Sequence, residues 1–185
     1  MNEPEYQKMH DAEDHYWWFV ARRDLAKRLL FRYIEGEPGR LLDLGCGTGA
    51  ALNELQVEHP QTACIGVDAY ATALKLSHRR GLAKLVLGSG TAIPLQSGAI
   101  DCAISLDTIE HIEDDARVLS EMYRALRPHG IAVISVPAYQ WLWGPHDVAL
   151  MHYRRYTARQ FKRLAEKAGF RVVLCSYSVF FLFPV

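Results

Sequence analysis

Three glycines at alternate positions follow a short apolar segment that contains an acid. Residues 41–50 read LLDLGCGTGA, so that Gly45, Gly47 and Gly49 come shortly after Asp43. Glycine has no Cβ and adopts positive φ without strain, which lets the backbone come close to a ligand. If a helix begins after the third glycine, its free N–H groups face the same ligand. The spacing therefore predicts a strand, a ligand-binding loop and a helix.

A second acid, Asp68, ends the next apolar segment, residues 63–67. A carboxylate there can accept hydrogen bonds from both hydroxyls of a ribose, so the glycine loop and Asp68 together indicate a nucleoside. The alternative is that Asp68 only caps the helix that follows. The glycine spacing also fits the loose dinucleotide fingerprint, which makes an NAD-linked oxidoreductase a competing hypothesis. Asp43 and the third glycine disfavour it, because a carboxylate attracts an ammonium group and gives nothing to a pyrophosphate.

Side chains with acid–base or anion-binding chemistry collect in two later segments. Residues 107–111 read DTIEH, and residues 138–156 form a long connection rich in rings and cations. Since an imidazole titrates near neutral pH, His111, His146 and His152 are candidate general bases. Arginines pair with carboxylate or phosphate, and aromatic rings cover a planar or acyl group. The predicted acceptor contacts are Trp17, Arg23, Trp143, His146, Arg154, Arg155 and Tyr156.

The paired arginines Arg154 and Arg155 also allow a plainer interpretation. They would then lie in solvent or pair with the acidic N-terminal segment. An exposed ion pair of that kind contributes little to the stability of the fold.

Short apolar strands alternate with amphipathic helices from residue 40 onward. This alternation predicts an α/β fold of the Rossmann-like, doubly wound type, with a mostly parallel sheet and helices on both faces. Ligands bind such sheets beyond the carboxyl ends of the strands, where the glycine loop, Asp68 and residues 107–111 would meet. We expect strands at 40–44, 63–67, 83–87, 100–106, 131–136 and from 171. We expect helices from the glycine loop to about 58, at 70–80, at 113–127 and from Thr157. Thr157 and Gln160 are predicted to form a capping box at the start of the last helix.

The chain divides into two parts. Residues 1–38 are expected to form an N-terminal helical cap, with one amphipathic helix over 11–34, and residues 39–185 the Rossmann-like domain with an acceptor loop at 137–157. The front of the helix reads HYWWFVARR. It either anchors the helix on the domain or acts as a lid over the ligand.

In combination, these motifs resemble those of class I S-adenosylmethionine-dependent methyltransferases. The resemblance is carried by DLGCGTG at 43–49, Asp68, the Ile93-Pro94 loop and DTIEH at 107–111. HYWWFVARR and LWGPHDVALMHYRRYT are also similar to one bacterial branch that acts on small molecules or cell-envelope precursors.

The resemblance implies S-adenosyl-L-methionine as cofactor and transfer of its methyl group to a small-molecule acceptor, O-directed rather than N- or C-directed. Ser89 stands where many relatives carry an aspartate, and its hydroxyl would be a weaker partner for the adenine. The implied cofactor contacts are Asp43, Gly45, Cys46, Gly47, Gly49, Asp68, Ala69, Ser89, Gly90, Leu106 and Asp107.

Two alternatives accompany this interpretation. Asp107, Glu110 and His111 resemble a metal-binding turn of some quinone-precursor O-methyltransferases, but capping of the turn by Glu110 and His111 is favoured, and we predict no metal. A cofactor-binding module without turnover would suit the replaced acid at Ser89.

Composition narrows the partners and the compartment. Lysine plus arginine equals aspartate plus glutamate at 21 each, so no basic field favours nucleic acid. The four cysteines are scattered without a C-x-x-C pair, and the N-terminus is acidic where a secretory signal would be basic. We therefore expect a cytoplasmic protein.

The C-terminal end departs from the family pattern. Such sheets carry a seventh, antiparallel strand after the sixth, whereas this chain stops at 180–185, reading FFLFPV. Either the chain is a truncated piece of a longer one, or the apolar tail contacts the domain, a second copy in a homodimer, or a membrane surface and lipid-linked substrate.

Overall fold

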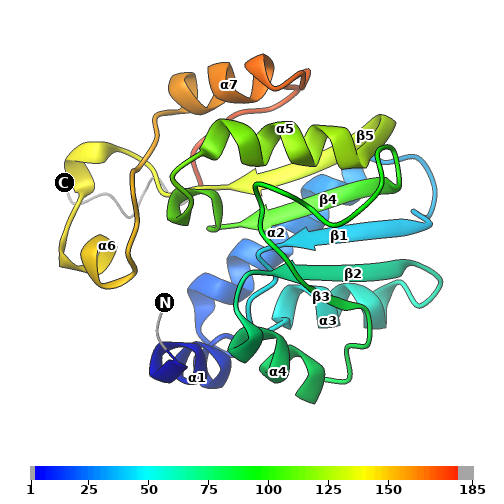
Figure 1. Ribbon diagram of the computed structural model, residues 1–185, viewed down its shortest axis with the longest axis horizontal. Coiled ribbons are helices and arrows are strands. Elements are labelled where there is room, and N and C mark those ends of the chain that lie inside the picture. The colour runs from blue at the N-terminus through cyan, green and yellow to red at the C-terminus, as the bar shows by residue number, and fades with distance from the viewer. Residues whose placement is uncertain (1–2, 179–185) are drawn as a thin grey trace.

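A five-stranded parallel sheet forms the centre of the molecule in the computed structural model, which describes residues 3–178 (Figure 1). The sheet order is β3-β2-β1-β4-β5, so the direction of winding reverses between β1 and β4. The mostly parallel α/β sheet predicted from the sequence is confirmed. The strands are β1 Arg40–Leu44, β2 Ala63–Asp68, β3 Leu85–Leu87, β4 Ile100–Leu106 and β5 Leu126–Ser135.

Helices cover both faces of the sheet because successive side chains of a strand point to opposite faces. Leu41 of β1 packs with Leu52 on one face, whereas Leu42 packs with Leu119 and Met122 on the other. In Figure 1, α5 and α7 lie together above the sheet. The helices are α1 Glu3–Ala12, α2 Trp17–Tyr33, α3 Ala50–Glu58, α4 Ala71–Arg79, α5 Asp115–Ala125, α6 Pro145–Ala149 and α7 Ala158–Lys167, with short 3-10 helices η1 Ile109–His111 and η2 Gln140–Leu142.

The N-terminal segment forms two helices, so the prediction of one helix over 11–34 is wrong. The helix α1 ends at Ala12, and α2 begins at Trp17 after an extended residue, Tyr16. Tyr6 of α1 packs beside α4, whereas Leu30 of α2 packs against the sheet. Because these two surfaces lie in different directions, the chain must turn between the helices.

One local prediction is confirmed and one boundary moves. Thr157 and Gln160 form the predicted capping box of α7. The helix α5 ends at Ala125, earlier than expected, because Leu126 already pairs with Ile100 of β4 across an irregular register. The long connection 138–156 is folded, since η2 and α6 lie within it.

The sixth strand predicted from residue 171 does not form within the described residues. Side-chain contacts hold this segment in place of a hydrogen-bonded ladder: the Phe170 ring packs on Tyr123, and the Ala158 N–H donates to the Tyr177 hydroxyl at 2.9 Å. The outer edge of β5 therefore has no strand partner among residues 3–178. The apolar tail and the seventh strand fall at 179–185, outside the described residues.

Among the described residues, none of the helices combines the length and apolar character needed to cross a membrane.

Candidate functional site

The glycine loop adopts a conformation that only glycine accepts easily at three positions. Gly45, Gly47 and Gly49 all have positive φ, at +76°, +55° and +85°. A Cβ on Gly45 would lie 2.2 Å from the side chain of Thr108. The Gly45 N–H donates to the Val67 carbonyl at 2.7 Å, which holds the loop against the end of β2. The glycines thus let the loop pack closely against Thr108 and the end of β2.

Asp68 fixes this loop through its carboxylate. One oxygen accepts the Gly47 N–H and the other accepts the Tyr70 N–H, both at 2.9 Å. Tyr70 is the N-cap residue of α4, so the alternative in which Asp68 only caps that helix does not describe this arrangement. A carboxylate has about four acceptor sites, so about two remain for a ligand such as a ribose diol. Burial raises the pKa of Asp68 in spite of these hydrogen bonds.

Asp43 lies buried beneath the loop at 3 % exposure. Burial, and secondly the charge of Asp68, raise its pKa to about 7, while Arg22 acts in the opposite direction. Removing a carboxylate from water is costly unless a positive group compensates it. The carboxylates of Asp43 and Asp68 together therefore favour a nucleoside ligand that carries positive charge.

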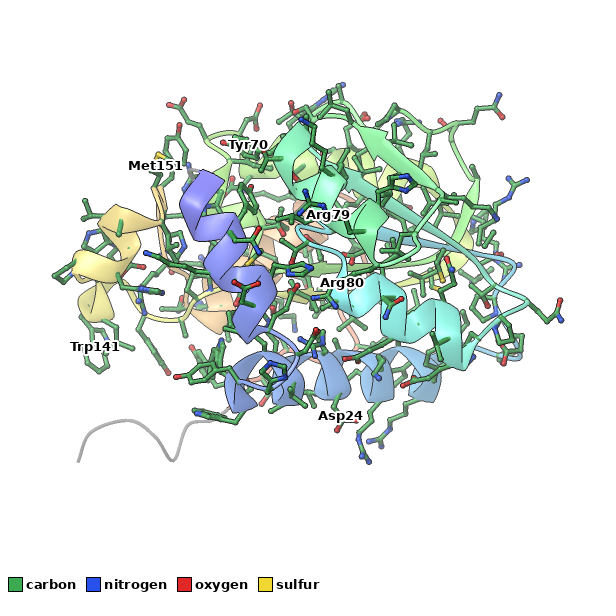
Figure 2. All side chains as sticks on the ribbon, turned by 90° about the horizontal axis from the view of Figure 1, so that it is seen from below. Asp24, Tyr70, Arg79, Arg80, Trp141 and Met151 are labelled. Carbon is green, nitrogen blue, oxygen red and sulfur yellow. The ribbon has the colours of Figure 1, made fainter. Side chains whose placement is uncertain are left out.

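The helix α1 lies over the glycine loop. A Cβ on Gly47 would be 3.3 Å from the end of the Met9 side chain, and the Tyr6 and Tyr70 rings have centroids 5.7 Å apart. Figure 2 views this side of the molecule, with α1 alongside the segment that carries Arg80. The N-terminal helical cap predicted from the sequence thus reaches the cofactor loop through a helix that was not predicted.

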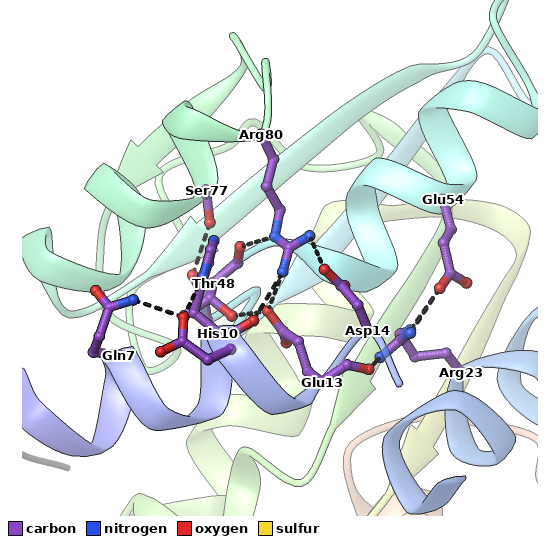
Figure 3. Close-up of polar contacts among 11 residues, drawn as sticks. Gln7, His10, Glu13, Asp14, Arg23, Thr48, Glu54, Ser77 and Arg80 are labelled. Atoms are coloured by element: carbon purple, nitrogen blue, oxygen red, sulfur yellow. Dashed lines mark hydrogen bonds and ion pairs between the residues drawn. The ribbon is translucent and has the colours of Figure 1, made fainter. Parts of the chain in front are cut away.

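A buried polar cluster ties the turn between α1 and α2 to the loop (Figure 3). The Glu13 carboxylate accepts hydrogen bonds from the Thr48 hydroxyl and, at 2.8 Å, from Arg80. Arg80 also donates to the Thr48 carbonyl at 3.0 Å, and Arg23 donates to the Glu13 carbonyl at 2.7 Å. Sequence reasoning missed Glu13 and Arg80, because nothing local distinguishes them from surface charges on a helix.

Arg22, and not the predicted Arg23, faces the end of β4. Arg22 forms an ion pair with Asp107, whose other oxygen accepts the Ser135 hydroxyl at 2.8 Å. Arg23 is 4 % exposed, and it also donates to Glu54 at 2.8 Å. Neighbouring residues of a helix point about 100° apart, so Arg22 reaches the end of β4 while Arg23 turns toward Glu13 and Glu54.

Glu110, His111 and His152 come together beyond the end of β4, where the acceptor side is predicted. Their ligand atoms all lie within 4.8 Å of one another, and the two imidazole centroids are 4.6 Å apart. The Nδ1 atom of His152 lies 2.9 Å from an oxygen of Asp147. Burial first, and then His152, lower the pKa of His111 to about 4, so this imidazole is neutral at pH 7.

Several predicted acceptor contacts are engaged inside the protein. Arg155 contacts both oxygens of the buried Asp147, at 2.7 and 2.9 Å. Arg154 and the Tyr156 hydroxyl both bind Asp115, at 2.8 and 2.9 Å. Neither arginine pairs with the N-terminal acids, which was the alternative. These groups hold the loop after β5 in place, and their roles toward an acceptor stay predictions.

An open cavity joins the cofactor and acceptor sides. Five predicted residues do not line this cavity: Gly49, Ser89, Trp17, Trp143 and Arg154. Gly49 packs on Ser77 and Leu82, and the Ser89 hydroxyl forms a hydrogen bond with the Thr91 hydroxyl at 2.8 Å. Unpredicted lining residues include Tyr16, Trp18, Phe19, Arg22, Thr108 and Glu110. Of the predicted residues, the lining contains Asp43, Gly45, Cys46, Gly47, Asp68, Ala69, Gly90, Leu106, Asp107, His111, His146, His152, Arg23, Arg155 and Tyr156.

Comparison with known families places this site in context. Residues 16–174 match the family described as methyltransferase domain. The chain therefore belongs to this family, within the class I S-adenosylmethionine-dependent methyltransferases. Its cofactor is S-adenosyl-L-methionine, as the resemblance implied.

The sequence is also similar to individual curated proteins. A trans-aconitate 2-methyltransferase of Deinococcus radiodurans is 31% identical over 158 residues, which is 85% of this chain and 58% of that protein. A probable S-adenosylmethionine-dependent methyltransferase of Mycolicibacterium smegmatis is 29% identical over 164 residues, 87% of this chain and 62% of that protein. The chain thus spans only about three fifths of the length of these relatives.

Among solved structures, the fold is similar to that of phosphoethanolamine N-methyltransferase 2 from Haemonchus contortus in complex with S-adenosyl-L-methionine. The TM-score is 0.67 at 23% identity, covering 79% of this chain and 36% of that one. This likeness shows the shared fold.

Proposed function

We propose that this chain transfers the methyl group of S-adenosyl-L-methionine to a small-molecule acceptor, at an oxygen atom. One arrangement carries the proposal: the buried carboxylates of Asp43 and Asp68 flank a loop of three glycines with positive φ. Its backbone suits a nucleoside, and its acids suit the ammonium group of the methionine portion.

The cofactor is oriented by groups on both sides of the loop. Asp68 has acceptor sites left for the ribose hydroxyls, and Ala69 would flank the adenine. Leu106 and Asp107 at the end of β4 would border the methionine portion, since both line the cavity. Asp43 supports the ammonium group from below, directly or through water. This orientation directs the sulfonium methyl toward Glu110 and the imidazoles.

Alignment supplies most of the rate enhancement. A sulfonium methyl is already activated, and an in-line displacement gains up to about 7–11 kcal/mol from orientation in favourable intramolecular models. An oxygen acceptor must also lose a proton, and the proximity of the His111 and His152 imidazoles, with centroids 4.6 Å apart in the cavity, supports them as candidate bases. The Deinococcus relative, a trans-aconitate 2-methyltransferase, supports a small-molecule acceptor.

The test is methyl transfer from labelled S-adenosyl-L-methionine to a library of phenols, carboxylic acids and lipid precursors. We expect labelled product with at least one hydroxyl- or carboxyl-bearing class, and far less with amines of matched size. Labelling confined to amines or to carbon would overturn the O-directed assignment.

A cofactor-binding module without turnover is the second candidate, and the position of Ser89 outside the cavity lining favours it. It predicts binding of S-adenosyl-L-methionine without label transfer to any acceptor class.

We place the protein in the cytoplasm, because Cys46, Cys64 and Cys102 are buried free thiols.

The edge of β5, which has no strand partner among residues 3–178, supports the hypothesis of a homodimer, and a lipid-linked acceptor is the alternative. Sedimentation with and without lipid vesicles separates them, since a homodimer forms without lipid.

A further inference from the structure

The acceptor side brings together three metal-binding side chains from separate elements. Glu110 and His111 come from η1 after β4, and His152 comes from the folded connection after β5. Their ligand atoms lie within 4.8 Å of one another, and all three residues line the cavity that contains the glycine loop. Asp107 does not join them, because its carboxylate is held by Arg22 and Ser135. The cluster is thus assembled by the fold and not by one sequence motif.

Glu110 is a buried carboxyl group with no compensating contact. It is 0 % exposed, and neither of its carboxylate oxygens has a hydrogen-bond partner among the described residues. An ionised carboxylate in such a place costs several kcal/mol by order of magnitude unless a cation accompanies it. One of its oxygens lies within 4.8 Å of a ring nitrogen of each histidine, so a cation bound there would contact all three side chains.

The His152 imidazole is held by one nitrogen, which leaves the other for a ligand. His152 uses Nδ1 toward Asp147, and Asp147 is itself fully buried and fixed by Arg155 and the Gly144 N–H at 2.9 Å. Histidines that bind metals almost always have the second nitrogen bonded to a carboxylate or a backbone oxygen. His152 therefore has the surroundings of a metal ligand, and the His111 ring lies beside it, with the two centroids 4.6 Å apart.

We propose that Glu110, His111 and His152 bind one divalent cation of the zinc type. Two imidazoles and one carboxylate are a donor set that zinc accepts, with the fourth position open to water or substrate. Ligands at about 2.0–2.1 Å from a tetrahedral ion lie about 3.4 Å apart. The ligand atoms lie within 4.8 Å of one another in this structure, so they must move together by up to about 1.4 Å, which small side-chain rotations provide.

The fourth position faces the cavity where an acceptor would approach. An oxygen of the acceptor bound there would lose its proton to solvent more easily, because the cation stabilises the resulting anion. This role rests on the proposed function. Binding of the cation itself does not.

Titration of the untagged protein with Co²⁺, followed by visible absorption and by competition with Zn²⁺, tests the site. We expect one equivalent to bind to the wild type. Glu110→Gln and His152→Ala should each weaken Co²⁺ binding at least tenfold, since loss of even a supporting residue costs about 10–100-fold. His15→Ala is the matched control, because His15 is an exposed histidine outside the cluster.

Glu110→Gln keeps the shape of the side chain and removes the unpartnered charge, so the variant should melt no lower than the wild type without metal. Calorimetric binding of S-adenosylhomocysteine to each variant separates failure of the metal site from failure of the proposed function. Absence of stoichiometric Co²⁺ binding to the wild type would overturn the proposal, and so would equal binding by His152→Ala and His15→Ala.

Discussion

At the scale of single residues, the site collects buried acids that lack enough positive charge. Asp43, Asp68 and Glu110 all have raised pKa values, and burial is the largest cause for each. Arg22 is the cation that lowers the pKa of both Asp43 and Glu110. A cationic ligand therefore compensates the negative charge of these carboxylates, and its affinity should depend on their protonation.

Cofactor affinity should rise with pH through the titration of Asp43. Its pKa is about 7 in the free protein, and a bound cation favours the ionised form. The ionised fraction goes from about one tenth at pH 6 to about nine tenths at pH 8, so affinity for S-adenosyl-L-methionine should rise up to about tenfold. Calorimetry at both pH values measures this. Asp43→Asn should bind more weakly and lose most of the pH dependence; an identical pH dependence in the variant would refute the assignment.

The same carboxylate should destabilise the free protein above acidic pH. The folded pKa of about 7 exceeds the unfolded value of about 3.9, so folding disfavours the ionised form. The penalty therefore grows from about pH 4 to pH 7 and is constant above that range. Urea denaturation without cofactor should show Asp43→Asn gaining stability over the wild type between pH 5 and pH 7. A difference that shrinks over this range would contradict the raised pKa.

At the scale of elements, the N-terminal helices hold the cofactor loop from above. Glu13 in the turn between α1 and α2 binds Thr48 and Arg80, so the lid and the loop share one buried polar cluster. Breaking a buried pair by removing one partner leaves an uncompensated charge and costs about 3–5 kcal/mol.

Arg80→Ala should therefore lower the free energy of unfolding by about 3 kcal/mol, because Glu13 loses its cation. Arg79→Ala is the adjacent control: Arg79 is exposed, and a change there should stay within about 0.5 kcal/mol. Chemical denaturation of both variants measures the difference. Equal stabilities of the two variants would show that the cluster does not hold the lid on the loop.

Local patterns in the sequence predicted most helices and strands, whereas contacts between elements decided which side chains pair and whether the last strand forms. The strands follow from apolar segments bounded by glycines and acids, and the capping box at Thr157 is a contact between near neighbours. The buried carboxylate of Asp147 pairs with Arg155 and His152 of the same connection. The spacing of apolar residues along the sequence does not predict such a pairing. The predicted sixth strand does not form within residues 3–178 although the edge of β5 is available, because side-chain contacts of Phe170 and Tyr177 position that segment instead.

At the scale of the whole molecule, the reversal of strand order between β1 and β4 concentrates the chemistry. The loop after β1 supplies the glycines, the end of β2 supplies Asp68, and the connections after β4 and β5 supply the Glu110 cluster to one cavity. Cofactor side and acceptor side thus lie next to each other at the carboxyl edge of the sheet. That arrangement, with membership of the methyltransferase family, supports the proposal of methyl transfer.

Calorimetric titration with S-adenosyl-L-methionine, S-adenosylhomocysteine and NAD tests this account most directly. We predict binding of both sulfur nucleosides at one per chain and no binding of NAD. Asp68→Ala should weaken that binding more than tenfold, while Arg28→Ala, on the exposed side of α2, should leave it unchanged. Absence of heat with both sulfur nucleosides, or equal losses in the two variants, would contradict the central claim.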